Sequence, residues 1–112
     1  MKIYYNLYVS DELKGKEQEI IYKLKRDQVQ LNKYIIVFAQ NTKNHLEFYD
    51  SVLLLQKCWE KENLFVVGIA DGYDGALHLI ENIVNEVYEV TGDVQIRTYL
   101  SEQQRKFEER KV

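Results

Sequence analysis

The chain has little cysteine and no long apolar run. Its one cysteine, Cys58, cannot close a disulfide within the 112 residues, which excludes a disulfide-framed secreted domain. No apolar run approaches the roughly 18 residues that a membrane span requires. Residues 1–10 also lack the apolar stretch of a signal peptide. We therefore expect a cytoplasmic protein that does not contact membranes.

Positive charge is missing from one long stretch. Between Asp71 and Asp93 there are six acidic residues and no lysine or arginine, and the net charge of the chain is −3. Basic residues gather instead between Lys14 and Arg26, where they alternate with glutamates and Tyr22 is the only aromatic residue among them. This pattern is typical of a solvated helix face rather than a nucleic-acid platform, so no nucleic-acid partner is expected.

Length and composition are those of one globular domain. A chain of 112 residues with 46% hydrophobic and 29% charged residues can bury a stable core but not two independent ones. We assign residues 1–100 to a single α/β domain and residues 101–112 to a charged C-terminal tail, which can form a frayed helix.

Hydrophobic periodicity predicts strands alternating with helices. Alternation over residues 2–9 and 94–100 predicts two half-exposed strands, and continuous β-branched and aromatic runs over 34–39 and 64–70 predict two strands buried on both faces. Helical spacing of apolar residues predicts three helices. The first begins near Lys16, the second covers about 45–61 and the third covers about 74–91. Gly92 marks the end of the third helix.

This βαβαβαβ order predicts a three-layer domain around a four-stranded, mainly parallel sheet. We expect a flavodoxin-like or Rossmann-like arrangement, with strand order 2-1-3-4 preferred and 3-2-1-4 next. Both orders put one of the two fully apolar strands at an edge and the more polar first strand in the centre. Either the tyrosines of the first strand lie under helices, or a second subunit covers an apolar edge strand.

Ligands of such sheets bind at the carboxyl ends of the strands. Polar residues expected there include Asp11 after the first strand, Asn41 and His45 after the second, and the loop Asp71-Gly72-Tyr73-Asp74-Gly75 after the third. This loop opens a helix and can bind an anion through free amides. It lacks the spacing of a dinucleotide or P-loop motif. The alternative is that its glycines permit a tight turn while an aspartate caps the helix.

Metal and catalytic chemistry have weaker support in the sequence. Asp11, Glu12 and Asp71 could converge and bind Mg²⁺, although helix capping explains the same residues. His45 is a candidate general base, but no Ser-His-Asp or Cys-His pattern is apparent. One cysteine and two scattered histidines do not make a zinc site. No catalytic residue and no cofactor are assigned, with Mg²⁺ the one alternative.

The predicted helix over 45–61 is too apolar for a monomer. Its outward side would carry Leu54 and Cys58 beside Leu55 and Trp59, which predicts a subunit contact. The sequence therefore favours a non-catalytic interaction or regulatory module that acts as a homodimer, with a further protein partner possible. The alternative is a metal-dependent phosphate or nucleotide binder, including a small hydrolase, at the carboxyl end of the sheet.

Overall fold

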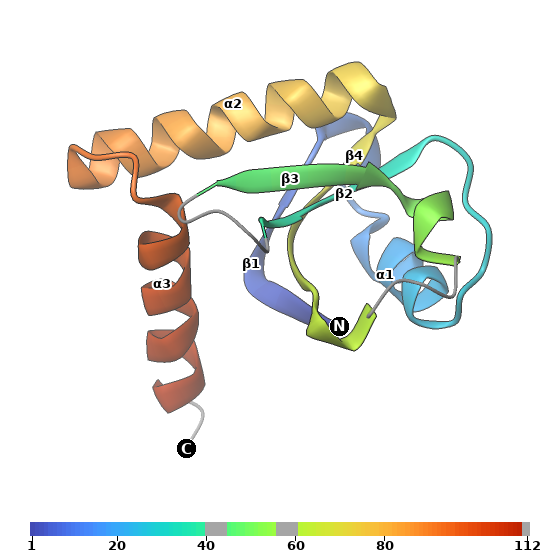
Figure 1. The fold of residues 1–112 in the computed structure, drawn as a ribbon, viewed down its shortest axis with the longest axis horizontal. Coiled ribbons are helices and arrows are strands. Elements are labelled where there is room, and N and C mark those ends of the chain that lie inside the picture. The colour runs from blue at the N-terminus through green and yellow to red at the C-terminus, as the bar shows by residue number, and fades with distance from the viewer. Residues whose placement is uncertain (40–44, 56–60, 111–112) are drawn as a thin grey trace.

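The computed structural model describes residues 1–39, 45–55 and 61–110. Its elements follow the order β1 (Lys2–Val9), η1 (Asp11–Leu13), α1 (Glu17–Lys25), β2 (Lys33–Phe38), β3 (Leu46–Asp50), η2 (Ser51–Leu55), η3 (Lys61–Asn63), β4 (Phe65–Asp71), α2 (Gly72–Thr91) and α3 (Ile96–Arg110) (Figure 1). None of the helices in these ranges is long and apolar enough to cross a membrane.

The four strands form one mixed sheet in the order β1-β4-β2-β3. Only β1 and β4 are parallel, whereas β2 is antiparallel to both β4 and β3. The predicted mainly parallel, flavodoxin-like or Rossmann-like sheet, with order 2-1-3-4 or 3-2-1-4, is therefore wrong. The physical reason is that β2 and β3 are joined by a short connection of residues 39–45, which allows a hairpin and leaves no room for a crossover helix.

The observed order accounts for the apolar character of two strands. In β2, Ile35, Ile36 and Val37 are at most 1% exposed, and β4 is buried along Val66–Ala70. Strands without a polar face must be covered on both sides, and they form the central pair here. The half-exposed β1 and β3 become the edges. The sheet order therefore needs neither helices over the tyrosines of a central first strand nor a second subunit over an apolar edge strand.

The predicted helix over 45–61 is wrong in its described part. Residues Leu46–Asp50 form β3, and Ser51–Leu55 form the short 3₁₀ helix η2. In β3, Leu46 and Phe48 pack toward the core beneath α2, whereas Tyr49 packs toward the core beneath α1. This period of two is that of a strand, and the apolar residues of η2 had extended it into an apparent helical arc.

The predicted strand over 94–100 is also wrong, because α3 begins at Ile96 and continues through the charged segment to Arg110. Its buried residues are Ile96, Leu100 and Gln104, spaced by four as one helix face requires. The strands over 2–9, 34–39 and 64–70 and the helices near Lys16 and over 74–91 are confirmed within a few residues.

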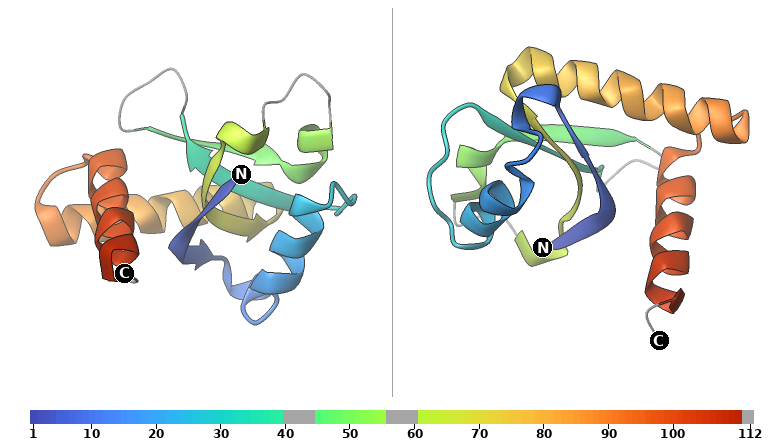
Figure 2. Two further views of the ribbon diagram at one scale, coloured as in Figure 1. Left: turned by 90° about the horizontal axis from the view of Figure 1, so that it is seen from below. Right: turned by 180° about the vertical axis from the view of Figure 1, so that it is seen from behind.

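Two apolar cores lie on opposite faces of the sheet. Helix α2 crosses one face, where Ala76, Leu79, Ile83 and Val87 meet the sheet, and α1 lies on the other with η1 and η2 (Figure 2). Helix α3 turns away from the end of α2 and runs down beside β1 (Figures 1 and 2). The core residues beneath α1 include Leu13, Ile20, Leu24 and Leu54.

Helix α3 covers the outer edge of β1. The Gln104 side chain accepts a hydrogen bond of 2.8 Å from the Tyr5 amide, which would otherwise lack a strand partner. The Tyr5 and Phe107 rings stack with centroids 4.4 Å apart, and Lys2 forms an ion pair with Glu108. Side chains from a helix thus take the place of a fifth strand at this edge.

Gly68 lies at a bulge where side chains of α2 and β2 come close to the β4 backbone. The pairing of β2 with β4 shifts between Ile36 and Val37, so that Val67 is an extra residue in β4. A Cβ atom at Gly68 would lie 3.2 Å from Leu79 Cδ2 and 3.3 Å from Ile36 Cδ1. Glycine is needed here because the helix and the neighbouring strand approach the β4 backbone closely.

We predict opposite effects for two glycine substitutions. Gly68→Ala should lower the free energy of unfolding by about 1–3 kcal/mol, because a methyl group overpacks this contact. Gly75→Ala is the matched control: nothing lies within 4 Å of its Cβ position, and alanine should stabilise α2 by up to about 1 kcal/mol. Urea denaturation measures both values. Equal effects of the two substitutions would contradict the close contact at Gly68.

Candidate functional site

The carboxyl ends of the parallel strands meet the start of β2 at one edge of the sheet. Ser10 follows β1, Asp71 ends β4, and Lys33 begins β2, where it is paired with Asp71 in the antiparallel register. The two strand ends predicted to lie together, at Asp11 and Asp71, thus meet at this edge. Lys33 was missed, because only an antiparallel β2 brings the beginning of that strand here.

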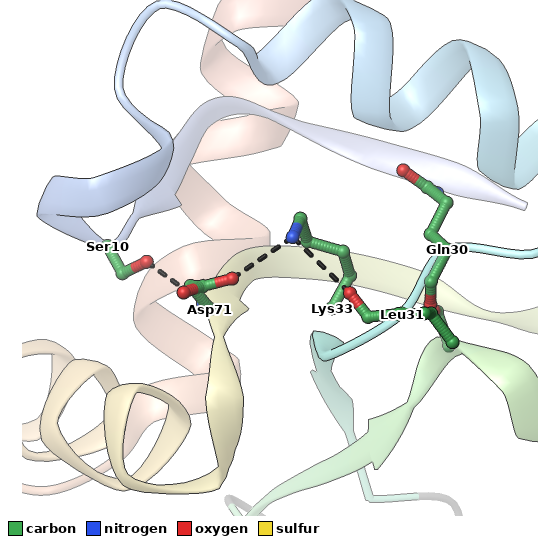
Figure 3. Close-up of polar contacts among 6 residues, drawn as sticks. Ser10, Gln30, Leu31, Lys33 and Asp71 are labelled. Atoms are coloured by element: carbon green, nitrogen blue, oxygen red, sulfur yellow. Dashed lines mark hydrogen bonds and ion pairs between the residues drawn. The ribbon is translucent and has the colours of Figure 1, made fainter.

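Hydrogen bonds join these segments (Figure 3). The Asp71 amide donates to Ser10 Oγ at 3.1 Å, and Lys33 Nζ donates to Asp71 Oδ1 at 3.0 Å and to the Leu31 carbonyl at 3.3 Å. The Lys33 and Asp71 side chains are 27% and 33% exposed. Partial desolvation strengthens this ion pair relative to one in open solvent, so the cluster fixes three chain segments at one point.

In the loop Asp71-Gly72-Tyr73-Asp74-Gly75, the first amide of α2 and the Asp71 carboxylate are already engaged within the protein. The Gly72 amide, at the start of α2, donates to the Asn32 carbonyl at 2.8 Å, and Lys33 neutralises Asp71. Gly72 has φ +77° and lies 3.3 Å from the Asn32 side-chain amide, so glycine serves the turn. Asp71 is the N-cap residue but makes no side-chain capping bond. Asp74 is exposed in the first turn of α2.

Two of the three acidic residues considered for Mg²⁺, Asp11 and Asp71, form ion pairs with lysines. Asp11 forms an ion pair with Lys14 at 3.0 Å, and its side chain is 90% exposed. Asp71 is paired with Lys33. Over residues 1–39, 45–55 and 61–110, no group of three or more His, Cys, Asp or Glu residues is placed to hold a metal ion.

Two cavities flank this edge. One, of about 150 Å³, lies between the end of β1 and α2, and its lining includes Ser10, Asp11, Gly75, His78 and Asn82. The other, of about 400 Å³, lies beside α1 and is lined by Lys16, Lys23 and Lys33 against Glu12, Glu19 and Asp71. Three lysines and three carboxylates balance there, with two of the pairs bonded at 3.0 and 3.1 Å.

Two further candidate residues do not join this edge. His45 lies just before β3, where its carbonyl accepts a hydrogen bond from the Ala39 amide, at the opposite end of the sheet from Asp71. A general base shared between His45 and the Asp71 loop is therefore ruled out by their positions. Asn41 lies outside the described residues.

Of the four residues of the predicted subunit contact, the structure describes Leu54 and Leu55. Leu54 is 5% exposed and belongs to the core beneath α1, so its predicted role as an outward contact is wrong. Leu55 is 36% exposed at the end of η2. Cys58 and Trp59 lie outside the described residues.

Strand β3, which precedes Leu54, is an edge strand of the sheet. Within the described residues the sheet ends at β3, which pairs with β2 on one side only. The Ala39 amide donates to the His45 carbonyl, and antiparallel pairing alternates, so the backbone groups of Glu47 and Tyr49 point toward β2. Those of Leu46, Phe48 and Asp50 consequently point outward from the sheet.

Helix α2 carries a second apolar stripe on the side of this edge. Its core residues recur at Ala76, Leu79, Ile83 and Val87, and a neighbouring stripe, which we call the α2 flank, consists of Tyr73, Leu77, Ile80, Val84 and Tyr88. Tyr73, Leu77 and Tyr88 are 55%, 40% and 57% exposed. The Phe48 and Tyr73 rings lie 5.3 Å apart, so the flank contacts β3 at its Tyr73 end.

Glu47 and Tyr49 form a polar pair on the other face of β3. The Tyr49 hydroxyl donates to the Glu47 carboxylate. Burial, followed by this hydrogen bond, raises the pKa of Tyr49 to about 12. The tyrosine therefore stays protonated and keeps its donor at neutral pH, so the edge strand presents one donor and one acceptor side by side.

No protein-family model, curated protein or solved structure matches the chain.

We predict that Lys33 and Asp71 are energetically coupled. In a double-mutant cycle of Lys33→Met and Asp71→Asn, the coupling energy in urea denaturation should be about 0.5–1 kcal/mol and should fall in high salt, because the pair is partly screened by solvent. The exposed pair Lys14 and Asp11, mutated in the same way, is the control and should show no measurable coupling. Equal coupling in both pairs would contradict a structural role for the cluster.

Proposed function

We propose that the protein is a non-catalytic protein-interaction module, which takes an extended segment of another chain as a fifth strand beside β3. The observation that carries this proposal is the juxtaposition of an edge strand with outward backbone groups and the apolar α2 flank above it. An added strand gains affinity from main-chain hydrogen bonds and gains specificity from alternate side chains.

The two edges of the sheet differ in a way that supports this choice. At β1, the Gln104 side chain bonds the Tyr5 amide and Phe107 covers the Tyr5 ring. Unprotected edge strands are liable to pair with other chains, and proteins usually cover or blunt them. Among the described residues such a cover is present at β1, whereas the sheet ends at β3.

The α2 flank supplies the apolar part of the surface. The apolar surface begins where Tyr73 contacts Phe48 of β3. It continues along α2 through Leu77, Ile80, Val84 and Tyr88. Every second side chain of an added strand would point toward α2, because side chains alternate along a strand. Exposed tyrosines suit such a contact, since they bury a large ring and keep a hydroxyl at the wet rim.

The carboxyl edge supports a binding module more than an enzyme. Asp71, Lys33, Ser10 and the Gly72 amide bond to one another or to the neighbouring backbone, which engages several of the groups that could bind a phosphate or a metal. The network joins β1, β2 and β4, so it holds the sheet that presents β3.

A strand-forming peptide tests the proposal. A blocked peptide of alternating threonine and valine, titrated into ¹⁵N-labelled protein, should shift the amide signals of Leu46, Phe48 and Asp50 and those of the α2 flank. Leu77→Lys should weaken binding at least several-fold, because a charge replaces an apolar contact. The matched control is Asn85→Lys on the exposed side of α2 that points away from the sheet, which should leave binding unchanged.

The outcome that would overturn the proposal is equally direct. Shifts confined to residues outside β3 and the α2 flank, or equal binding by the Leu77 and Asn85 variants, would show that this surface does not take a strand.

A further inference from the structure

We infer that the segment added to β3 is β3 of a second copy of this chain, antiparallel, with the two-fold axis passing through Phe48. The inference rests on the proposed function and names its partner. It is carried by the self-complementarity of the five residues Leu46–Asp50 in that register.

The backbone favours this register. With the axis at Phe48, Phe48 faces Phe48 of the second copy, and Leu46 faces Asp50 of the second copy. These three residues direct their amides and carbonyls outward, so every outward group of β3 gains a partner, about six hydrogen bonds in all. Strands of five residues are ordinary in length, and both copies are used from end to end.

The side chains agree with the backbone. Glu47 would face Tyr49 of the second copy, and Tyr49 would face Glu47 of that copy. Within one chain, the Tyr49 hydroxyl already donates to the Glu47 carboxylate. The same donor and acceptor would therefore meet across the interface, with no like charges opposed. The two Phe48 rings would form a cross-strand aromatic pair beneath the α2 flank.

Neighbouring registers are poorer. An axis at Glu47 would set two Glu47 carboxylates opposite each other, which is destabilising. An axis at Tyr49 would leave Leu46 beyond the end of the second copy's strand. The register with odd spacing is excluded for a two-fold axis normal to the sheet, because facing side chains would then point to opposite faces.

The α2 flank fits the same symmetry. A two-fold axis normal to the sheet keeps both α2 helices on one face of a continuous sheet of eight strands, with their flanks directed toward the axis. Tyr73 and Leu77, the exposed residues at the start of the flank, would then line the space above the paired β3 strands from both sides.

A disulfide between two different cysteine variants tests this register directly. In a Cys58→Ser background, Glu47→Cys and Tyr49→Cys are prepared as separate full-length proteins. In the proposed dimer the Cα atoms of residue 47 and residue 49 of the second copy lie about 4.5 Å apart, a distance that a disulfide spans. Two residues 47, or two residues 49, lie about 8 Å apart and cannot be bridged.

With glutathione disulfide as oxidant, we expect the mixture to form a covalent heterodimer at least tenfold faster than either protein alone. Sedimentation at tens of micromolar should show a dimer for the wild type and for Cys58→Ser. A monomer, or equal rates of cross-linking in the mixture and in the single proteins, would overturn the inference. A monomer whose β3 still binds the threonine–valine peptide refutes the second copy alone, whereas loss of both results refutes the proposed function as well.

Discussion

The arrangement of this protein depends on the burial of β2 and β4 on both faces. Ile35, Ile36 and Val37 in β2 and Val66, Val67 and Ile69 in β4 leave neither strand a side that tolerates water. Burying one such side chain contributes about 1.5–3 kcal/mol, so moving either strand to an edge would forfeit several of these contributions. The pair must lie at the centre of the sheet, and β1 and β3 are left as its edges.

Once the edges are set, other features follow. At β1, α3 supplies Gln104 as a hydrogen-bond acceptor and Phe107 as a cover. At the carboxyl edge, the antiparallel β2 brings Lys33 to Asp71, and the cluster binds three segments together. At β3, the outward groups and the α2 flank form the surface that we propose for strand addition. The burial of β2 and β4 thus places the Lys33–Asp71 cluster and the surface proposed for interaction at different parts of the sheet.

Much of the local structure could be predicted from the sequence. The strand over 2–9 and the helix over 74–91 have strong periodicity, the strands over 34–39 and 64–70 are continuous apolar runs, and the structure confirms all four. Two segments were misassigned because their patterns fit both periods. Leu46 and Phe48 alternate as a strand requires, but the apolar residues of η2 extend them into a helical arc. In α3, the buried residues Ile96, Leu100 and Gln104 recur every four residues, as a helix requires, whereas the alternation over 94–100 predicted a strand.

The strand order could not be derived from periodicity, because periodicity does not set the direction of a strand. Treating 45–61 as a helix imposed a crossover, made β2 parallel and placed its carboxyl end, with Asn41 and His45, beside Asp71. The apolar character of the two central strands contained the correct constraint, since it already conflicted with both expected orders. Lys33 and the α2 flank could be recognised only once β2 was antiparallel and β3 was an edge.

Amide hydrogen exchange at two protein concentrations tests the central claim most directly. If β3 pairs with another copy, the amides of Leu46, Phe48 and Asp50 should exchange more slowly as concentration rises, while those of Glu47 and Tyr49, bonded to β2, should stay protected at both. Fast exchange of the three outward amides at both concentrations would contradict the account.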